Sequence, residues 1–386
     1  MKIEDWYCDN FESKLNGRYI TNKHILPLLE DYKNLYEISV AGHSENEIPI
    51  SLVKIGKGPK VVLGWSQMHG NEATTTKALF DLFKFMSQKD FFQEEIDTFL
   101  NNYTLFIIPI LNPDGAKLYT RENKNQIDLN RDAQNLSQSE SRTLRKIFDE
   151  VKPSLCLNMH DQRSIYGFVD GNAATVSFLS PAADKERTLT EARIIAMQHI
   201  AKINDVLQNY IPGQVGRYHD SYNPECVGDT FQQLGVPTIL FEAGHFQQDY
   251  QREKTREFIF YSLLALFDIA FPKKDKNSYK EYFTIPENLK NYNDFILKNV
   301  SVREFSQPVS IAIQYVETFN KTKIELIPII MDIGSLKNRY AYSEKDMEGT
   351  EILTNSHNNL TVGVDISEIF NKYEDLAIIC KNNLLL

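Results

Sequence analysis

Residues 60–72, which read KVVLGWSQMHGNE, decide the fold of this chain. The apolar run at 60–65 predicts a buried strand, and apolar residues recur at helical spacing from 71 to 86, which predicts a helix. Gly70 occupies the turn between them and allows the backbone to come close to an ion or ligand. This unit therefore puts His69 and Glu72 just beyond the carboxyl end of a strand.

The same alternation of strands and helices continues to about residue 271. Further strands are predicted at 103–111, 154–158 and 237–241, and further helices at 139–151, 189–210, 228–234 and 252–271. This order predicts an α/β domain with a mostly parallel mixed sheet flanked by helices. Ligands bind beyond the carboxyl ends of the strands in such sheets. His69, His160 and Glu242 each lie at the end of a predicted strand, so we expect them on one rim.

The pattern changes after the charged, helix-stopping segment PKKDKNS at 272–278, which is a candidate linker. Beyond it, several segments are β-branched or alternate between polar and apolar residues: 308–316, 323–330, 353–364 and 376–380. We therefore expect a catalytic domain at 1–272 and a small β-rich C-terminal domain at 285–386.

Bulk properties exclude some classes of protein. The net charge of -10 argues against a nucleic-acid partner, which usually requires a basic stripe. The four cysteines form no C-x-x-C pair, so a zinc ribbon or redox motif is not expected. No apolar run reaches membrane-spanning length, and the N-terminus does not resemble a secretory signal. We expect a cytoplasmic protein that has no membrane partner.

Three residues are candidate ligands for one metal ion. A catalytic zinc usually has three protein ligands and one open position. The spacing of His69 and Glu72 lets both side chains converge, although H-x-x-E also occurs as a surface histidine with a helix-capping glutamate. His160 follows the strand at 154–158, where a histidine satisfied in the core is the alternative. Asp161 is a candidate to orient a ligand histidine.

The other candidates can move protons or bind anions. Glu242 ends an apolar run, where a carboxylate is costly unless it is paired or functional; it is either a general base or a partner of Arg121 or Arg131 in a salt bridge. Asn130 and Arg131 can bind a carboxylate, and Arg121 can stabilise an oxyanion. A solvated surface charge is the alternative for each arginine. The NPDG sequence at 112–115 indicates only a turn.

The order of the motifs HGNE, NPDG, TREN, DLNR, NMHD and FEAG resembles the M14 zinc carboxypeptidase family over residues 40–270. Two histidines and one glutamate are the ligand set known for carboxypeptidase A itself, so that set comes with the resemblance. It implies one zinc ion per chain held by His69, Glu72 and His160. The interval from Glu72 to His160 is shorter than in the digestive members, and the β-rich C-terminal part is additional.

The resemblance also implies the roles of the remaining site residues. Arg121 would polarise the scissile carbonyl group, while Asn130 and Arg131 would bind the terminal carboxylate of the substrate. Glu242 would be the general base and then the acid for the leaving amine. The family uses a mobile tyrosine near the substrate terminus, for which Tyr218 and Tyr222 are both candidates. Loops around 163–180 and 213–230 are expected to form the pocket that selects the substrate residue.

We therefore expect a zinc metallocarboxypeptidase that hydrolyses an amide bond next to a free carboxylate of a peptide. One alternative is a deacylase of N-acyl amino acids, of the aspartoacylase and succinylglutamate desuccinylase type, which shares the same site residues. The NPDG turn favours the peptidases, and the β-rich C-terminal segment favours the deacylases. A non-catalytic binding module on this scaffold is an alternative of another class, which a missing ligand or base would favour; none is missing.

Overall fold

The computed structural model describes residues 1–88, 91–271, 278–321, 323–354, 360–366, 368–371 and 377–379. The chain divides into two compact units, each built from several stretches. Unit 1 comprises 1–162, 175–244 and 251–287, and unit 2 comprises 163–174, 245–250 and 288–386. The candidate linker at 272–278 lies outside the described residues except for Ser278.

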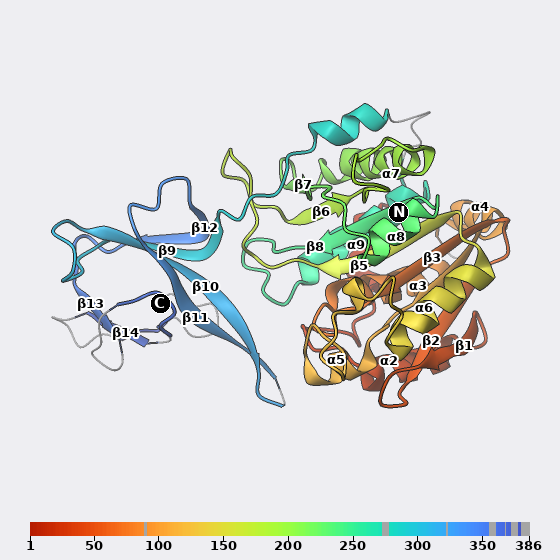
Figure 1. Cartoon of the computed structure of the whole chain (residues 1–386), viewed down its shortest axis with the longest axis horizontal. Coiled ribbons are helices and arrows are strands. Elements are labelled where there is room, and N and C mark those ends of the chain that lie inside the picture. The colour runs from red at the N-terminus through yellow and green to blue at the C-terminus, as the bar shows by residue number, and fades with distance from the viewer. Residues whose placement is uncertain are drawn as a thin grey trace. The chain divides into compact units, whose positions relative to one another are not determined.

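A mixed sheet of eight strands forms the centre of unit 1 (Figure 1). Its strands are β1 (Glu37–His43), β2 (Pro49–Gly56), β3 (Lys60–Ser66), β4 (Tyr103–Ile108), β5 (Leu155–Asp161), β6 (Val176–Leu179), β7 (Val215–Arg217) and β8 (Thr238–Ala243). Their order across the sheet is β1-β2-β4-β3-β5-β8-β6-β7. The central strands β4, β3, β5 and β8 are parallel to their neighbours in this group, whereas β1, β2 and β6 form antiparallel pairs.

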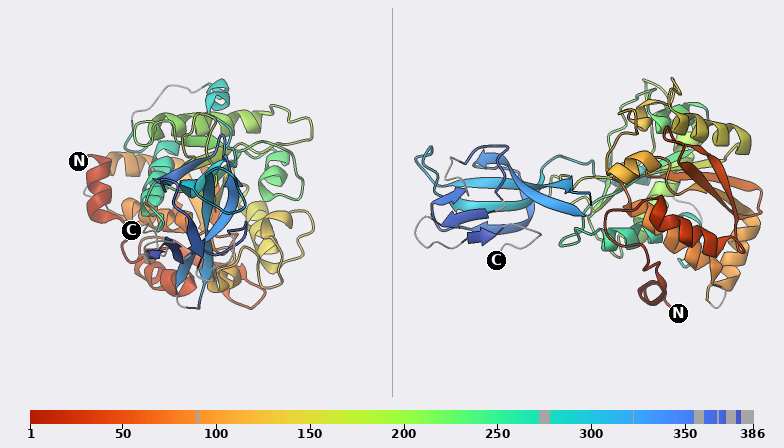
Figure 2. Two further views of the ribbon diagram at one scale, coloured as in Figure 1. Left: turned by 90° about the vertical axis from the view of Figure 1, so that its left-hand side faces the viewer. Right: turned by 90° about the horizontal axis from the view of Figure 1, so that it is seen from below.

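Helices flank this sheet, as Figure 2 shows from two further directions. The helices of unit 1 are α1 (Ile3–Asn10), α2 (Asn22–Tyr32), α3 (Thr74–Ser87), α4 (Gln93–Asn102), α5 (Pro113–Leu118), α6 (Ser139–Val151), α7 (Glu191–Leu207), α8 (Val227–Gln233) and α9 (Glu253–Leu266), with short 3₁₀ helices η1 (Leu129–Arg131) and η2 (Tyr279–Thr284). The predicted α/β class, with its mixed sheet and flanking helices, is confirmed. No helix in the described part of the chain combines the length and apolar character needed to cross a bilayer.

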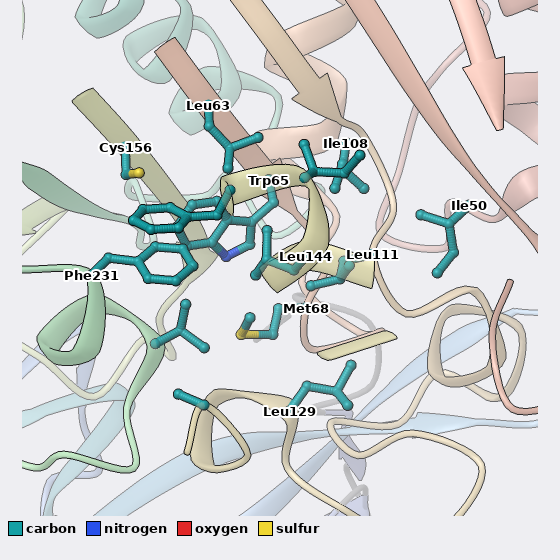
Figure 3. Packing of buried hydrophobic residues seen from close by; sticks show 14 of the residues in the cluster. Ile50, Leu63, Trp65, Met68, Ile108, Leu111, Leu129, Leu144, Cys156 and Phe231 are labelled. Carbon is teal, nitrogen blue, oxygen red and sulfur yellow. The ribbon is translucent and has the colours of Figure 1, made fainter. Parts of the chain in front are cut away.

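One face of the sheet is covered by α6 and α8. Trp65 of β3 packs edge to face on Phe231 of α8, with ring centroids 5.5 Å apart, and Leu144 of α6 belongs to the same buried cluster (Figure 3). Cys156 of β5 also lies in this cluster, as its apolar surroundings in the sequence suggest. Because side chains alternate along a strand, His160 of β5 lies on this same face, four residues beyond Cys156.

Unit 2 is built from β-strands. Its larger sheet contains β9 (Tyr292–Val300), β10 (Val309–Phe319), β11 (Ile324–Gly334) and β12 (Tyr340–Asp346) in the order β11-β10-β9-β12. A second sheet contains β13 (Ile352–Thr354), β14 (Glu368–Asn371) and β15 (Ala377–Ile379). Alternating apolar residues of β10, such as Ile311, Ile313 and Tyr315, form part of the core of unit 2. The predicted β-rich character of the C-terminal region is therefore confirmed.

A buried ion pair joins α3 to α9 in unit 1. Arg256 and Asp81 are both 0% exposed, and Nη2 and Nε of the guanidinium each lie 2.6 Å from a carboxylate oxygen. The same guanidinium donates to the carbonyl oxygens of Leu15 and Glu12 at 2.6 and 2.8 Å. Since every donor and acceptor here is buried, each partner depends on the other.

We expect Arg256→Met to lower the free energy of unfolding by about 3–5 kcal/mol, because it leaves the Asp81 carboxylate buried without its cation. Urea unfolding followed by circular dichroism measures the change. Lys146→Met is the matched control, because Lys146 pairs with Glu150 at 3.9 Å and both side chains are more than half exposed; its effect should stay within about 0.5 kcal/mol. Equal effects of the two substitutions would contradict the prediction.

Candidate metal centre and active site

Two histidines and one glutamate come together at the carboxyl ends of β3 and β5. Nδ1 of His69 lies 3.1 Å from Nδ1 of His160. Oε1 of Glu72 lies 2.8 Å from the first of these nitrogens, and Oε2 lies 2.8 Å from the second. Both imidazoles are 2% exposed. The ligand atoms of the three side chains all lie within 4.8 Å of one another.

A fourth residue, Asp128, fixes the orientation of His69. Nε2 of His69 lies 3.0 Å from Oδ1 of Asp128, while Nη1 of Arg121 lies 3.2 Å from Nδ1 of His69. A guanidinium nitrogen can only donate, so Nδ1 of His69 accepts and Nε2 carries the proton that is donated to Asp128. Burial raises the pKa of Asp128, but His69 and Arg121 lower it by a larger amount. The pKa is therefore lower than usual, and this carboxylate stays ionised.

This tautomer makes the three residues a fitting cation site. The lone pair of His69 Nδ1 faces the Glu72 carboxylate at 2.8 Å, and both groups are acceptors. Two acceptors at this distance repel each other unless a cation lies between them. The donor set of two imidazoles and one carboxylate is also one that zinc accepts. The residues present therefore fit a zinc ion.

Glu242 lies in β8 directly opposite His160 in the parallel pairing with β5. Burial, followed by the negative charges of Glu72 and Asp161, raises the pKa of Glu242 well above its ordinary value. Among the ion pairs of the described residues, none joins Glu242 to Arg121 or Arg131. The salt-bridge alternative for Glu242 thus has no support.

Asp161 serves a different partner from the one that its position in the sequence suggests. Its Oδ2 accepts hydrogen bonds from the backbone N–H and the hydroxyl of Thr74, at 3.0 and 2.6 Å. Neighbouring side chains in a strand point to opposite faces, so Asp161 turns away from His160 and toward the start of α3. The carboxylate that orients a histidine of the cluster is Asp128.

The three candidate anion-binding residues lie close to this cluster. The Arg121 side chain is 42% exposed; it pairs with Asp128 at 3.0 Å and lies 3.5 Å from Glu72. Asn130 and Arg131 lie in η1, immediately after Asp128. The side-chain oxygen of Asn130 accepts from the backbone N–H of Val227 at 3.2 Å, which ties this pair to α8. Arg131 is exposed.

The two candidate tyrosines have different neighbours. The hydroxyl of Tyr218 donates to Gln162 at 2.9 Å, two residues beyond His160. The hydroxyl of Tyr222 donates to Gln233 at 3.2 Å, at the end of α8. Only Tyr218 is thus bonded to the chain that follows a candidate ligand, and both remain candidates for substrate contact.

The NPDG segment forms more than a turn, because it also supports the loop that carries His69. Asn112 caps α5 by accepting from the backbone N–H of Gly115 at 2.8 Å, and its amide donates to the carbonyl oxygen of Met68 at 3.2 Å. A Cβ atom on Gly70 would overlap the backbone of Gly115. Gly70 therefore allows two segments of backbone to meet, and this contact supports the loop that carries His69.

Asp128 and Asn112 belong to the site, although the sequence did not lead us to predict them there. The sequence does indicate them, because Asp128 is the first residue of the DLNR motif and Asn112 is the first residue of the NPDG motif. Their partners, His69 and Met68, are distant in sequence, so the spacing alone did not reveal the contacts.

Comparison with solved structures supports the fold. A metallo-carboxypeptidase from Burkholderia cenocepacia superposes with a TM-score of 0.52 over 64% of this chain and 69% of that chain, at 17% identity. A metallo-carboxypeptidase from Pseudomonas aeruginosa, solved with (2-guanidinoethylmercapto)succinic acid, gives a TM-score of 0.51 over 64% of this chain and 68% of that chain, at 16% identity. At these identities the likeness concerns the fold alone.

Comparison of sequences identifies the family. Carboxypeptidase SOL1 of Arabidopsis thaliana is 24% identical over 210 residues, which are 48% of this chain and 42% of that protein. The match thus spans less than half the length of this relative. The sequence profile of the M14 peptidases, described as zinc carboxypeptidase, matches residues 22–253, which include every candidate site residue. The chain therefore belongs to the zinc carboxypeptidase family.

Proposed function

We propose that this chain is a zinc metallocarboxypeptidase that releases the C-terminal residue of a peptide. The observation that carries the proposal is the convergence of His69, Glu72 and His160, with Glu242 opposite His160 in the neighbouring strand. These four groups supply three metal ligands and one base. Membership of a family of zinc-dependent hydrolases supports the same chemistry.

His69, Glu72 and His160 would hold the zinc ion, and Asp128 would keep His69 in the tautomer that binds it. Zinc would supply Lewis acidity, which polarises a carbonyl group and activates a water molecule. The buried setting of the two imidazoles favours this chemistry, because electrostatic interactions are stronger where water is excluded.

Glu242 would take the proton from the attacking water and deliver it to the leaving amine. In support of this role, Glu242 pairs with His160 in the register of β5 and β8, and the charge of Glu72 acts on its carboxylate. Arg121 would donate N–H groups to the oxyanion that develops on the carbonyl oxygen. Its Nη1 already lies 3.2 Å from His69 Nδ1, so the guanidinium is within reach of the reacting group.

Asn130 and Arg131 would bind the terminal carboxylate of the substrate. A guanidinium can form two parallel hydrogen bonds to a carboxylate, and the exposed Arg131 is accessible to a ligand. Tyr218 or Tyr222 would close over this end of the substrate. A free carboxylate is present in peptides and in N-acyl amino acids, so the substrate assay has to include both.

Removal of the base should abolish turnover. We expect Glu242→Gln to lower kcat by about 10²–10⁴-fold and to retain zinc, since glutamine keeps the shape but cannot accept a proton. Glu140→Gln is the control for the same change of side chain, because Glu140 is a buried carboxylate that hydrogen-bonds to Asn123. Stopped assays with a C-terminally free peptide measure kcat, and elemental analysis measures zinc. Retained turnover in Glu242→Gln would refute its assigned role.

Metal binding should depend on the cluster and on its orienting carboxylate. We expect His69→Ala to lose zinc on dialysis and Asp128→Asn to bind it about 10–100-fold more weakly, because the imidazole is no longer held in one tautomer. Competition with a chelator measures both affinities. His219→Ala, in an exposed loop, should bind zinc as the wild type does. Wild-type turnover that survives exhaustive chelation would rule out a metal-dependent reaction.

Recognition of the free carboxylate should depend on Arg131. We expect Arg131→Met to lower kcat/KM by about 10–150-fold, which is the loss of charge-assisted hydrogen bonds. Arg142→Met, an exposed arginine of α6, is the control. The panel contains a peptide with a free C-terminus, its C-terminal amide and several N-acyl amino acids. Turnover of the N-acyl amino acids alone would replace the peptidase proposal with the deacylase alternative.

A further inference from the structure

Two stretches of unit 2 begin shortly after candidate active-site residues in the sequence. The stretch 163–174 begins just past His160, and the stretch 245–250 begins just past Glu242. The first is closely joined to the C-terminal strands: Gly167 exchanges backbone hydrogen bonds with Leu289 at 3.0 and 2.9 Å. A Cβ atom on Gly167 would overlap the ring of Tyr292, so this glycine allows close packing.

One carboxylate, Asp294 of β9, links all three stretches of unit 2. It is 0% exposed. Its Oδ2 accepts from the Ser164 hydroxyl at 3.2 Å and from the backbone N–H of Tyr315 at 2.7 Å, and its Oδ1 accepts from the Tyr250 hydroxyl at 3.1 Å. The amide of Gln314 donates to the same Oδ2 and, at 2.6 Å, to the Ser164 hydroxyl. Ser164 and Tyr250 come from the two stretches that leave unit 1.

Within unit 1, the buried Arg252 holds together the ends of β5 and β8, from which these two stretches continue. The guanidinium of Arg252 donates to the carbonyl oxygens of Ala243 and Gln162, each at 2.9 Å. Gln162 also donates its backbone N–H to Ala243 at 2.9 Å, which extends the β5–β8 pairing by one residue. Gln162 precedes Ser164 by two residues, and Arg252 follows Tyr250 by two residues.

We propose that Asp294 is a positioning residue for the candidate active site, acting through Ser164 and Tyr250 on the strand ends that carry His160 and Glu242. Only one residue of the chain separates Ser164 from Gln162, which accepts from Arg252, and only one separates Tyr250 from Arg252 itself. The consequence for turnover rests on the proposed function; the consequence for the strand ends does not.

Asparagine at position 294 weakens this connection with little change in volume. Asp294 accepts on both oxygens, whereas asparagine offers one acceptor oxygen and an NH₂ group that can only donate. At least one partner therefore meets a donor in place of an acceptor. Burial, followed by the charge of Asp294, raises the pKa of Tyr250, so its hydroxyl keeps the proton that it donates to this carboxylate. Opposite an NH₂ group the hydroxyl would have to turn round and accept from a neutral donor, which is a weaker bond than the one to the carboxylate.

Hydrogen exchange of the full chain tests the proposal directly. We expect Asp294→Asn to speed exchange of the amides of Gln162 and Gly244 about tenfold, because both belong to unit 1 at the crossings. The amides of β3 and β4 should exchange as in the wild type. Asp346→Asn is the matched control, since this carboxylate is exposed in the same unit and binds Asn299. Faster exchange confined to unit 2, or none, overturns the proposal.

Kinetics provide the second measurement. If the wild type releases C-terminal residues, we expect Asp294→Asn to lower kcat about 10–100-fold and to leave KM and the zinc content unchanged. A purely structural role would lower the melting temperature and leave kcat per folded molecule unchanged, which overturns the proposal. If the wild type turns over no substrate, the proposed function fails, and the exchange rates of Gln162 and Gly244 still decide the role of Asp294.

Discussion

Parallel pairing of β5 with β3 on one side and with β8 on the other is the constraint on which the candidate active site depends. Ser66 of β3 pairs with Met159, and His160 pairs with Glu242 of β8. Since the three strands run in the same direction, their carboxyl ends meet at one edge of the sheet. A shift of one residue in this register would turn His160 to the opposite face, away from Glu72.

Around this edge the chain buries more acceptors than donors. Glu72 and the lone pair of His69 Nδ1 face each other at 2.8 Å, and Arg121 lies 3.2 Å from the same nitrogen. Asp128 accepts from Nε2 at the opposite edge of this imidazole. Such an arrangement is unfavourable without a further positive charge, which explains why the site fits a divalent ion.

The strands that carry this site also supply chain to the second unit. The stretches after β5 and β8 contribute Ser164 and Tyr250 to the hydrogen bonds of Asp294, inside the β-rich unit. This unit is therefore not a simple addition at the end of the chain. It includes residues from the middle of the sequence, and the chain passes between the two units five times.

The sequence by itself determined the elements and the chemical types of the site. Runs such as 60–65 and 154–158 became β3 and β5, because local periodicity reflects which side chains a strand buries. Residues 139–151 became α6 with the same bounds, since its apolar spacing and the following Pro153 both mark a helix. By contrast, β1 and β2 at the edge of the sheet were not predicted, and β1 has no buried residue that would produce a clear pattern.

Only the tertiary structure decided which partners meet. Asp128 rather than Asp161 orients His69, NPDG supports the loop of Met68, and 163–174 belongs to the β-rich unit. The physical reason is that periodicity depends on neighbours along the chain, whereas these contacts join residues that are far apart in sequence. Their geometry follows from strand order and register, which no local pattern encodes.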